Sequence, residues 1–104
     1  MPHYADGTEA KVGDAVTGTF FNTPGVRAGT IISITPGQEA CNAQIQFAVA
    51  VEDDSHPDPP RMKVGEPRQV RGQQHGSAGP LFNIWTCVDY CDTNKLTKVG
   101  QFSP

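Results

Sequence analysis

The chain has little of what several common classes of protein require. Its three cysteines are too few, and odd in number, for the disulfide framework of a small secreted domain. No apolar run approaches the roughly 18 residues of a membrane span, and the first residues lack the basic and apolar segments of a secretion signal. With 8 basic against 11 acidic residues, the net charge of -3 disfavours nucleic-acid binding. We therefore expect a cytoplasmic protein with reduced thiols and no membrane partner.

Long helical patterns are also missing. Apart from one short segment that suits a single helical turn, no stretch keeps the hydrophobic period of a helix over ten residues. The 11 glycines and 9 prolines instead favour short elements joined by tight turns. A chain of 104 residues is the size of one domain with a compact core. We expect residues 1–104 to form a single all-β domain.

Alternation of apolar with polar or small residues predicts where the strands lie. The clearest run covers residues 43–51, in which Ala43, Ile45 and Phe47 share one face. In the run 81–90, Phe82 shares its face with other apolar residues and Trp85 takes the opposite face. The remaining strands are expected at residues 15–21, 27–35 and 98–99, with one helical turn at 92–96 that Asp92 caps.

The strand pattern stops after Val51 and resumes at Leu81. Structureless loops of this length are uncommon in compact domains and are often functional. The charge in this stretch is segregated, acidic in its first part and basic in residues 61–71, before a glycine-rich tail. We expect a long loop or a hairpin insertion over about residues 52–80, with a hairpin turn at residues 64–67.

Two short motifs, Val12-Gly13-Asp14 and Gly29-Thr30-Ile31, resemble the KOW type of SH3-like barrel, in which a glycine precedes an alternating strand. The segments 4–18, 36–46 and 89–99 resemble small uncharacterised proteins of tailed phages and prophages. The resemblance implies a small SH3-like β-barrel of about five strands with one short helical turn. It brings no catalytic motif and no cofactor.

Metal binding and catalysis find little support in the sequence. The soft ligands are Cys41, Cys87, Cys91, His56 and His75. Cys87 and Cys91 stand four residues apart on an expected strand, which separates their Cα atoms by about 13 Å, too far for one tetrahedral metal. Cys87, His75 and Asp89 are the residue types of a catalytic triad, but nothing in the sequence brings them together, and no nucleophile-elbow motif occurs. We expect neither a metal nor enzymatic activity.

Anion binding is the sharper hypothesis. Arginine clamps a phosphate with two hydrogen bonds, and successive backbone N–H groups in a glycine-rich segment form a concave anion site. An outward tryptophan stacks a nucleotide base. The residues expected to bind such a ligand are Arg68, Arg71, His75, Gly76, Ser77 and Trp85. The alternative is a solvated loop whose basic part pairs with its acidic part.

A protein interface is the other candidate. Phe20 and Phe21 are adjacent on an expected strand, so one of them points away from the core, and Tyr90 is a further aromatic anchor. The leading hypothesis is a non-enzymatic phage-type binding module that sequesters a small anionic ligand, for example a signalling nucleotide, or a host protein. The alternatives are a virion head-decoration or connector protein and a KOW-like nucleic-acid-binding domain. We also expect a homo-oligomer or a larger assembly.

Overall fold

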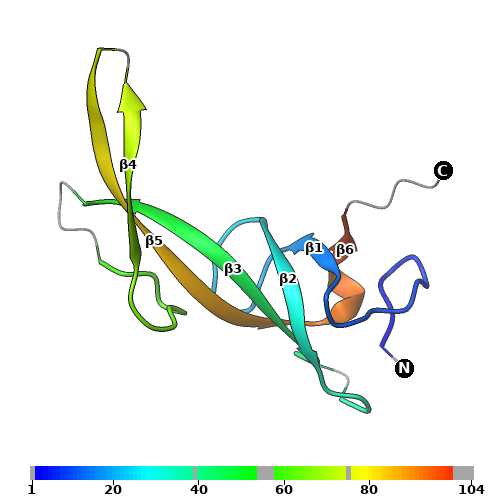
Figure 1. The fold of residues 1–104 in the computed structure, drawn as a ribbon. Helices are drawn as coiled ribbons and strands as arrows, with labels where there is room; N and C mark the ends of the chain where they lie inside the picture. Colours follow the sequence, from blue (N-terminus) through cyan, green and yellow to red (C-terminus); the bar gives the residue numbers. More distant parts are fainter. Residues whose placement is uncertain (1, 39, 54–57, 75, 100–104) are drawn as a thin grey trace. The chain divides into compact units, whose positions relative to one another are not determined.

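The computed structural model describes residues 2–38, 40–53, 58–74 and 76–99. Six antiparallel strands form one sheet in the order β4-β5-β3-β2-β1-β6 (Figure 1). Their bounds are β1 Ala15–Gly18, β2 Arg27–Ile34, β3 Ala43–Glu52, β4 Arg68–Gln74, β5 Ser77–Cys91 and β6 Thr97–Lys98. A short 3-10 turn, η2 (Thr93–Lys95), precedes β6. The prediction of an all-β chain with one short helical turn near residue 94 is confirmed, whereas the SH3-like barrel stays a prediction.

The strand β4 is the main difference from the expected arrangement. The hairpin of the region 52–80 has its turn between Gln74, the end of β4, and Ser77, the start of β5, and residues 64–67 precede β4 instead of forming its turn. Sequence alternation missed β4 because Val70 is its one large apolar residue. The strand forms because β5, which begins at Ser77 instead of Leu81, offers it a partner.

The chain divides into two compact units, residues 1–47 with 88–104, and residues 48–87. We call them the first and second units. The first unit contains β1, β2, β6 and η2. The second contains the hairpin of β4 with the first part of β5. Within the described residues, no helix is long and apolar enough to cross a membrane.

The core of the first unit is built where sequence alternation predicted it. Ala43, Ile45 and Phe47 of β3 are buried, and the Phe47 ring lies 5.1 Å from that of Phe20. A β-carbon at Gly29 of β2 would lie 2.5 Å from Cγ2 of Ile45. The expected glycine before the Ile31 strand is therefore required by the close approach of β2 to β3.

Asp14 anchors the segment that leads into β1. Its Oδ2 accepts hydrogen bonds from the hydroxyl of Tyr4 at 2.6 Å and from the backbone N–H of Lys11 at 3.0 Å. The ammonium group of Lys98 in β6 lies 3.5 Å from Oδ1. Gly13 precedes this carboxylate with φ 98, in the left-handed region that favours glycine. The Val-Gly-Asp motif is thus a turn that Asp14 holds in place.

The predicted orientation of β5 is wrong in its last part. Asp89 is fully buried and Cys91 nearly so, whereas Tyr90, on the face that carries Phe82, is exposed. Asp89 is buried because its carboxylate accepts hydrogen bonds from the backbone N–H of Asn22, the amide of Asn22 and the hydroxyl of Thr23. A hydrophobicity pattern assigns aspartate to the solvent face, so it gave the reverse orientation.

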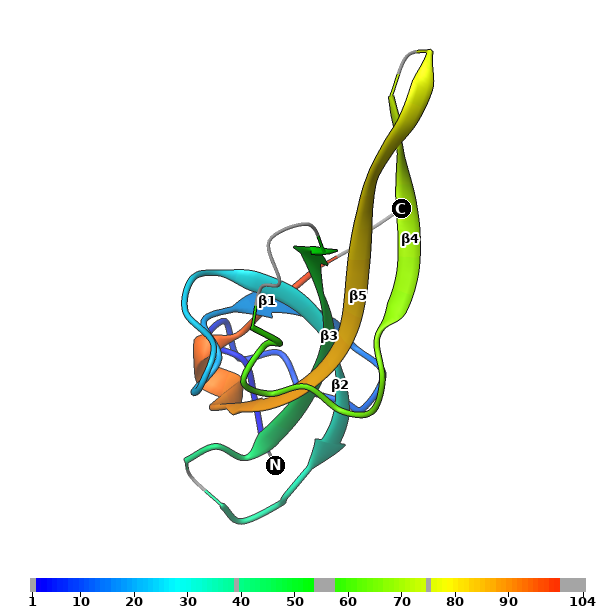
Figure 2. The same ribbon diagram turned by 90° about the vertical axis from the view of Figure 1, so that its left-hand side faces the viewer.

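The second unit contains the hairpin of β4 and β5 (Figure 2). Arg68 lies opposite Ile84, and Arg71 lies opposite Leu81. The register shifts between Arg71 and Gln73, which marks a bulge. A β-carbon at Gly79 would lie 2.5 Å from the carbonyl oxygen of Gly72, so the strands approach closely at this bulge. The glycines of the expected loop therefore serve strand pairing.

Candidate functional site

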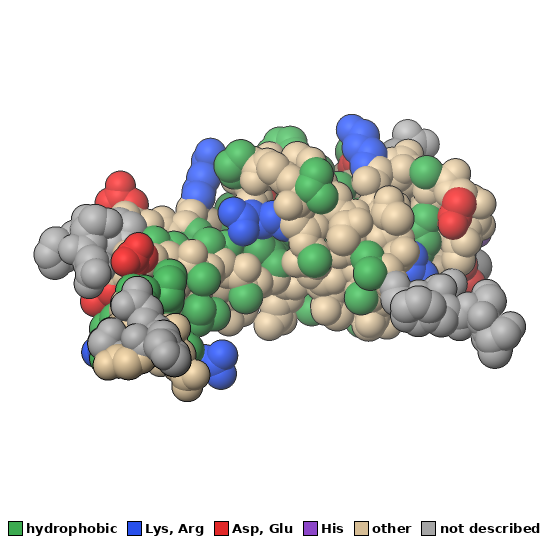
Figure 3. Space-filling model, turned by 90° about the horizontal axis from the view of Figure 1, so that it is seen from above, with side chains coloured by type: hydrophobic (Ala, Val, Ile, Leu, Met, Phe, Trp, Pro, Cys, Tyr) green, Lys and Arg blue, Asp and Glu red, His purple; other side chains and the backbone are tan. Residues whose placement is uncertain are grey.

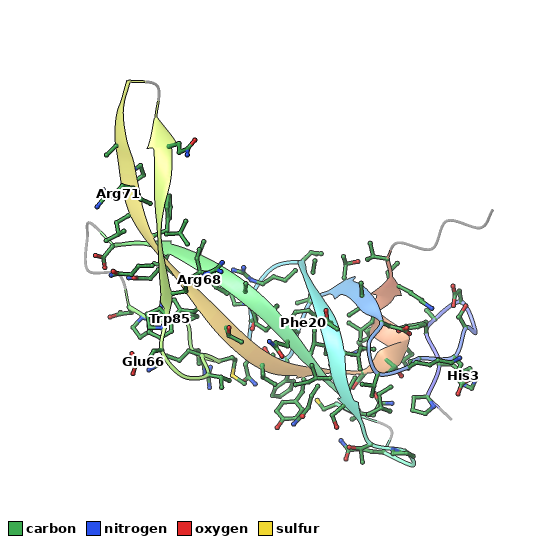
Figure 4. All side chains as sticks on the ribbon, in the orientation of Figure 1. His3, Phe20, Glu66, Arg68, Arg71 and Trp85 are labelled. Atoms are coloured by element: carbon green, nitrogen blue, oxygen red, sulfur yellow. The ribbon has the colours of Figure 1, made fainter. Side chains whose placement is uncertain are left out.

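The predicted anion-binding residues are divided between the two faces of the β4–β5 hairpin. Arg68 pairs with Ile84 and Arg71 with Leu81. Because successive side chains of a strand point to opposite faces, Arg71 shares a face with Trp85, whereas Arg68 lies on the other face. In Figure 4, Arg71 lies nearer the hairpin tip than Arg68 or Trp85. Arg68 and Arg71 therefore do not form one clamp.

The glycine-rich segment is a hairpin turn followed by strand. Gly76 has φ 80 in the turn, and Ser77 and Ala78 then pair with Gln74 and Gln73 of β4. This pairing replaces the concave loop expected from the glycines. His75 lies outside the described residues, as does the side chain of Ser77.

Lys63 places a cation at the Trp85 ring, and sequence reasoning did not single it out. Its ammonium nitrogen lies 5.3 Å from the ring centroid, within the range of a cation–π interaction. A β-bridge between Lys63 and Cys87 places it there, and the adjacent Val64 N–H donates to the carbonyl of Thr86 at 2.7 Å. We call Trp85, Lys63 and Arg71 the Trp85 face.

The Trp85 face also has internal partners for its polar groups. Arg71 donates from Nη1 to the carbonyl of Gly79 at 3.1 Å, and Asn83 donates to the Asp53 carboxylate at 2.8 Å. Lys63 and Arg71 thus share this face with an acidic side chain. The face is a mixed polar surface around a half-buried tryptophan.

The three aromatic residues predicted to form an interface differ in exposure. Phe20 is 2% exposed and belongs to the core, so it cannot be a surface anchor. Phe21 is 73% exposed and Tyr90 is 39% exposed. The Phe21 N–H donates to the Tyr90 carbonyl at 2.8 Å, so the two side chains project from adjoining backbone. Sequence reasoning identified both exposed rings but not the pocket beside them.

A pocket of about 460 Å³ in the first unit is lined by Phe21 and Tyr90. We call it the Phe21–Tyr90 pocket. The other residues that line it are uncharged and mostly polar: Asn22, Ser33, Thr35, Gln38, Cys41, Asn42 and Gln44. None of these lining residues is charged. Aromatic rings with a few placed polar groups are the usual composition of ligand pockets.

Buried hydrogen bonds fix two of the lining amides. Asn22 is held by Asp89 through its backbone N–H at 2.9 Å and its side-chain amide at 3.2 Å. Asn42 donates to the Thr93 hydroxyl and accepts from the Thr93 backbone N–H at 2.9 Å. The wall of the pocket is thus preorganised by Asp89 and Thr93, both of which are buried.

The other two amides are tied to the rim. Gln44 donates to the hydroxyl of Tyr90 at 3.0 Å, which orients the phenol ring. Gln38 donates from Nε2 to the carbonyls of Ala40 and Cys41, at 2.7 and 3.0 Å. The bonds of Gln38 fix the orientation of its amide, because a carbonyl partner requires the NH₂ group.

Cys41 occupies a strained position beside the pocket. Its φ of 51 places it in the left-handed region, and it is the one non-glycine residue found there among residues 2–38, 40–53, 58–74 and 76–99. Its backbone N–H donates to the carboxylate of Asp92. Such strain persists where surrounding contacts hold it, and it is frequent beside binding sites.

Metal chemistry has no assembled site in the described part of the chain, where no three His, Cys, Asp or Glu side chains are placed to hold an ion. His56 and His75 lie outside the described residues.

Hydrophobic and uncharged side chains are interspersed on the surface drawn in Figure 3. The Phe21–Tyr90 pocket is the candidate functional site.

Comparisons with protein-family models, with curated proteins and with solved structures found no match.

Proposed function

We propose that this protein is a non-enzymatic binding module that holds a small polar ligand in the Phe21–Tyr90 pocket. One observation carries the proposal: two exposed aromatic rings adjoin a pocket whose described lining is uncharged, and two of its amides, Asn22 and Asn42, are held by buried partners. Aromatic anchors on a surface typically supply the apolar contact of a binding site, and fixed amides supply its specificity. A binding role needs both and requires no catalytic group.

The resemblance to small tailed-phage proteins suggests the biological setting. A phage-type module of this size acts by sequestering a host molecule or a host protein, and the pocket provides a place for either a small molecule or an inserted side chain. Oligomerisation, a cytoplasmic location and the alternative of a virion component stay predictions. Nucleic-acid binding ranks lower because of the net charge of -3.

Thermal unfolding in the presence of a ligand panel tests the proposal. The panel contains neutral sugars, nucleosides, nucleotides and amino acids. A ligand at 100 times its Kd stabilises the folded state by about 2.7 kcal/mol, which raises the Tm by several degrees in a domain of this size. We expect Phe21→Ala and Tyr90→Ala to abolish the increase.

Val26→Ala is the matched control, because Val26 is 76% exposed and does not line the pocket. It should leave the ligand-induced increase unchanged. The proposal is wrong if no panel member raises the Tm, or if a ligand that does so acts equally on the Phe21 and Tyr90 variants.

A second candidate, anion binding, is favoured by the Trp85 face, where Lys63 and Arg71 lie on the same side of the hairpin as an aromatic ring. A nucleotide would place its phosphate at the cations and its base on the indole. Arg71→Ala should weaken nucleotide binding, whereas Arg68→Ala should not, because Arg68 lies on the opposite face. Both variants remove one positive charge, so equal losses would indicate only a nonspecific charge effect.

A further inference from the structure

We propose that the ligand of the Phe21–Tyr90 pocket is a neutral saccharide. This inference rests on the proposed function, since it names the ligand class for that pocket. It follows from three properties of the lining: the aromatic rings, the hydrogen-bonding groups left for a ligand, and the absence of charge among those lining side chains that the structure describes.

The aromatic rings match one face of a sugar. A pyranose has an apolar face of C–H groups, and the face of an aromatic ring carries the negative part of its quadrupole, which attracts such slightly positive hydrogens. Phe21 and Tyr90 project from adjoining backbone that a 2.8 Å hydrogen bond joins. Both rings remain substantially exposed, as a stacking platform requires.

The lining amides present hydrogen-bond acceptors. Within the described residues, the side-chain bonds of Asn22, Gln38 and Gln44 all run from their NH₂ groups, to Asp89, to two backbone carbonyls and to Tyr90. The carbonyl oxygens of these three amides are therefore left as acceptors. Sugar hydroxyls donate to such oxygens.

The hydroxyl groups complete the match. Ser33 and Thr35 line the pocket, and each hydroxyl both donates and accepts. The Tyr90 oxygen accepts from Gln44, so its own hydrogen is directed elsewhere and can reach a ligand oxygen. A sugar hydroxyl is likewise a donor and an acceptor, so a polyol satisfies this mixed set.

The charges around the pocket exclude ionic ligands. Among the described residues no cation lines it, and the carboxylate of Asp89 accepts a hydrogen bond from Asn22, which disfavours an anion. Lys95 lines only the small adjoining groove, and its ammonium lies 3.5 Å from Asp92. Within the part of the chain that the structure describes, a cationic ligand gains no carboxylate either, because Asp89 is fully buried and hydrogen-bonded. The pocket therefore selects a neutral ligand.

The volume of about 460 Å³ lies within the range of about 300–1,000 Å³ typical of ligand pockets. A nucleoside is a neutral competitor of similar size with a flat ring. The base of a nucleoside presents its donors and acceptors along one rigid edge, whereas the polar residues of the pocket come from several segments of the chain. The hydroxyl groups of a saccharide point in several directions, so a saccharide matches this arrangement better.

NMR titration of the ¹⁵N-labelled protein tests the inference. The neutral sugar probes are methyl β-glucoside, methyl β-galactoside, methyl α-mannoside and N-acetylglucosamine. Glucuronate serves as a charged sugar to compare with the glucoside, and adenosine and uridine serve as neutral ligands of the competing class. We expect at least one neutral sugar to shift the backbone amide signals of Asn22, Cys41 and Tyr90. Glucuronate should bind at least tenfold more weakly than the corresponding glucoside.

Substitutions measure how much each aromatic side chain contributes to sugar binding. Phe21→Ala should weaken sugar binding at least tenfold, Tyr90→Phe should weaken it less because the ring stays, and Val26→Ala should have no effect. If adenosine or uridine shifts these signals and no sugar does, the saccharide inference is wrong and the binding function stands. If no probe shifts them, and no member of the ligand panel raises the Tm, both are wrong.

Discussion

The carboxylate of Asp89 in β5 accepts hydrogen bonds from both the backbone and the side-chain amide of Asn22, although 67 residues separate them in the chain. This relationship ties the segment after β1 to β5. It also stands directly behind the Phe21–Tyr90 pocket, because Asn22 lines that pocket. Removing the carboxylate should therefore affect both stability and binding.

We expect Asp89→Ala to destabilise the protein by about 3–5 kcal/mol. The substitution leaves three donors on Asn22 and Thr23 without a buried acceptor, and each unsatisfied group costs about 1–3 kcal/mol. Urea unfolding measures the change. Asp58→Ala is the control, because Asp58 is exposed, and it should change stability by less than about 0.5 kcal/mol. A similar small loss for Asp89→Ala would contradict the assigned role.

We expect Gly29→Ala to destabilise the protein by about 1–3 kcal/mol, because its β-carbon would meet Cγ2 of Ile45 at 2.5 Å and the carbonyl of Gln46 at 2.8 Å. Gly18→Ala is the comparison. Its nearest neighbour, at 2.9 Å, is the end of the Leu96 side chain, and the nearest backbone atom, the carbonyl oxygen of Lys95, is 3.3 Å away. Thermal and urea unfolding should therefore rank Gly29→Ala as the more damaging substitution, and the reverse order would refute the close-approach explanation.

Acid should destabilise the first unit through Asp14. Partial burial raises the pKa of Asp14, but the hydrogen bonds from Tyr4 and Lys11 and the charge of Lys98 outweigh it, so the pKa lies below its usual range. A carboxyl whose pKa is lowered by folding stabilises the protein above its unfolded pKa of about 3.9, and this contribution is lost as the pH falls through the folded value.

The Tm should accordingly fall between about pH 5 and pH 2, and Asp14→Asn should reduce the slope of that fall. Tyr4→Phe should reduce it as well, since the hydroxyl of Tyr4 is one of the groups that lower the pKa of Asp14. Calorimetry across this pH range measures both slopes. An unchanged slope in both variants would contradict the role of the Tyr4–Asp14 bond.

The three thiols should differ in reactivity. Burial raises the pKa of the Cys91 thiol, which keeps it protonated at neutral pH, and Cys87 is fully buried. Cys41 is partly exposed at the pocket rim. Iodoacetamide should therefore label Cys41 first in the folded protein and all three thiols in urea, as peptide mass spectrometry can show. Equal labelling of Cys41 and Cys91 in the folded state would be inconsistent with this fold.

Sequence alternation predicted the parts of the fold in which burial follows hydrophobicity. It placed Ile45 and Phe47 on one apolar face, which is buried, and it predicted that one of Phe20 and Phe21 points away from the core, which is true of Phe21. It failed at β5, where the buried position 89 is an aspartate satisfied by distant donors. It also failed at β4, which pairs through backbone groups that leave no hydrophobic signature.

The candidate site was predictable only in part, for a similar reason. The adjacency of Phe20 and Phe21 predicts that one of them is exposed, without saying which. Tyr90 was named as an interface residue, although the expected orientation of its strand placed it on the same face as Phe82. The pocket depends on amides and hydroxyls from segments far apart in the chain, such as Asn22, Ser33 and Gln38. These residue types are common on any surface, so only their assembly distinguishes them. The basic residues formed a better sequence pattern, yet the hairpin separates Arg68 from Arg71.

The edge position of β4 gives its two arginines a use that requires no ligand. β4 is the last strand of the sheet on its side, so its outer backbone groups resemble a template for another strand. Arg68 and Arg71, one on each face, present positive charge to any second copy that approaches this edge. Charged side chains on an edge strand are one of the means by which proteins disfavour pairing between exposed edges, and we expect Arg68 and Arg71 to repel an identical edge in this way.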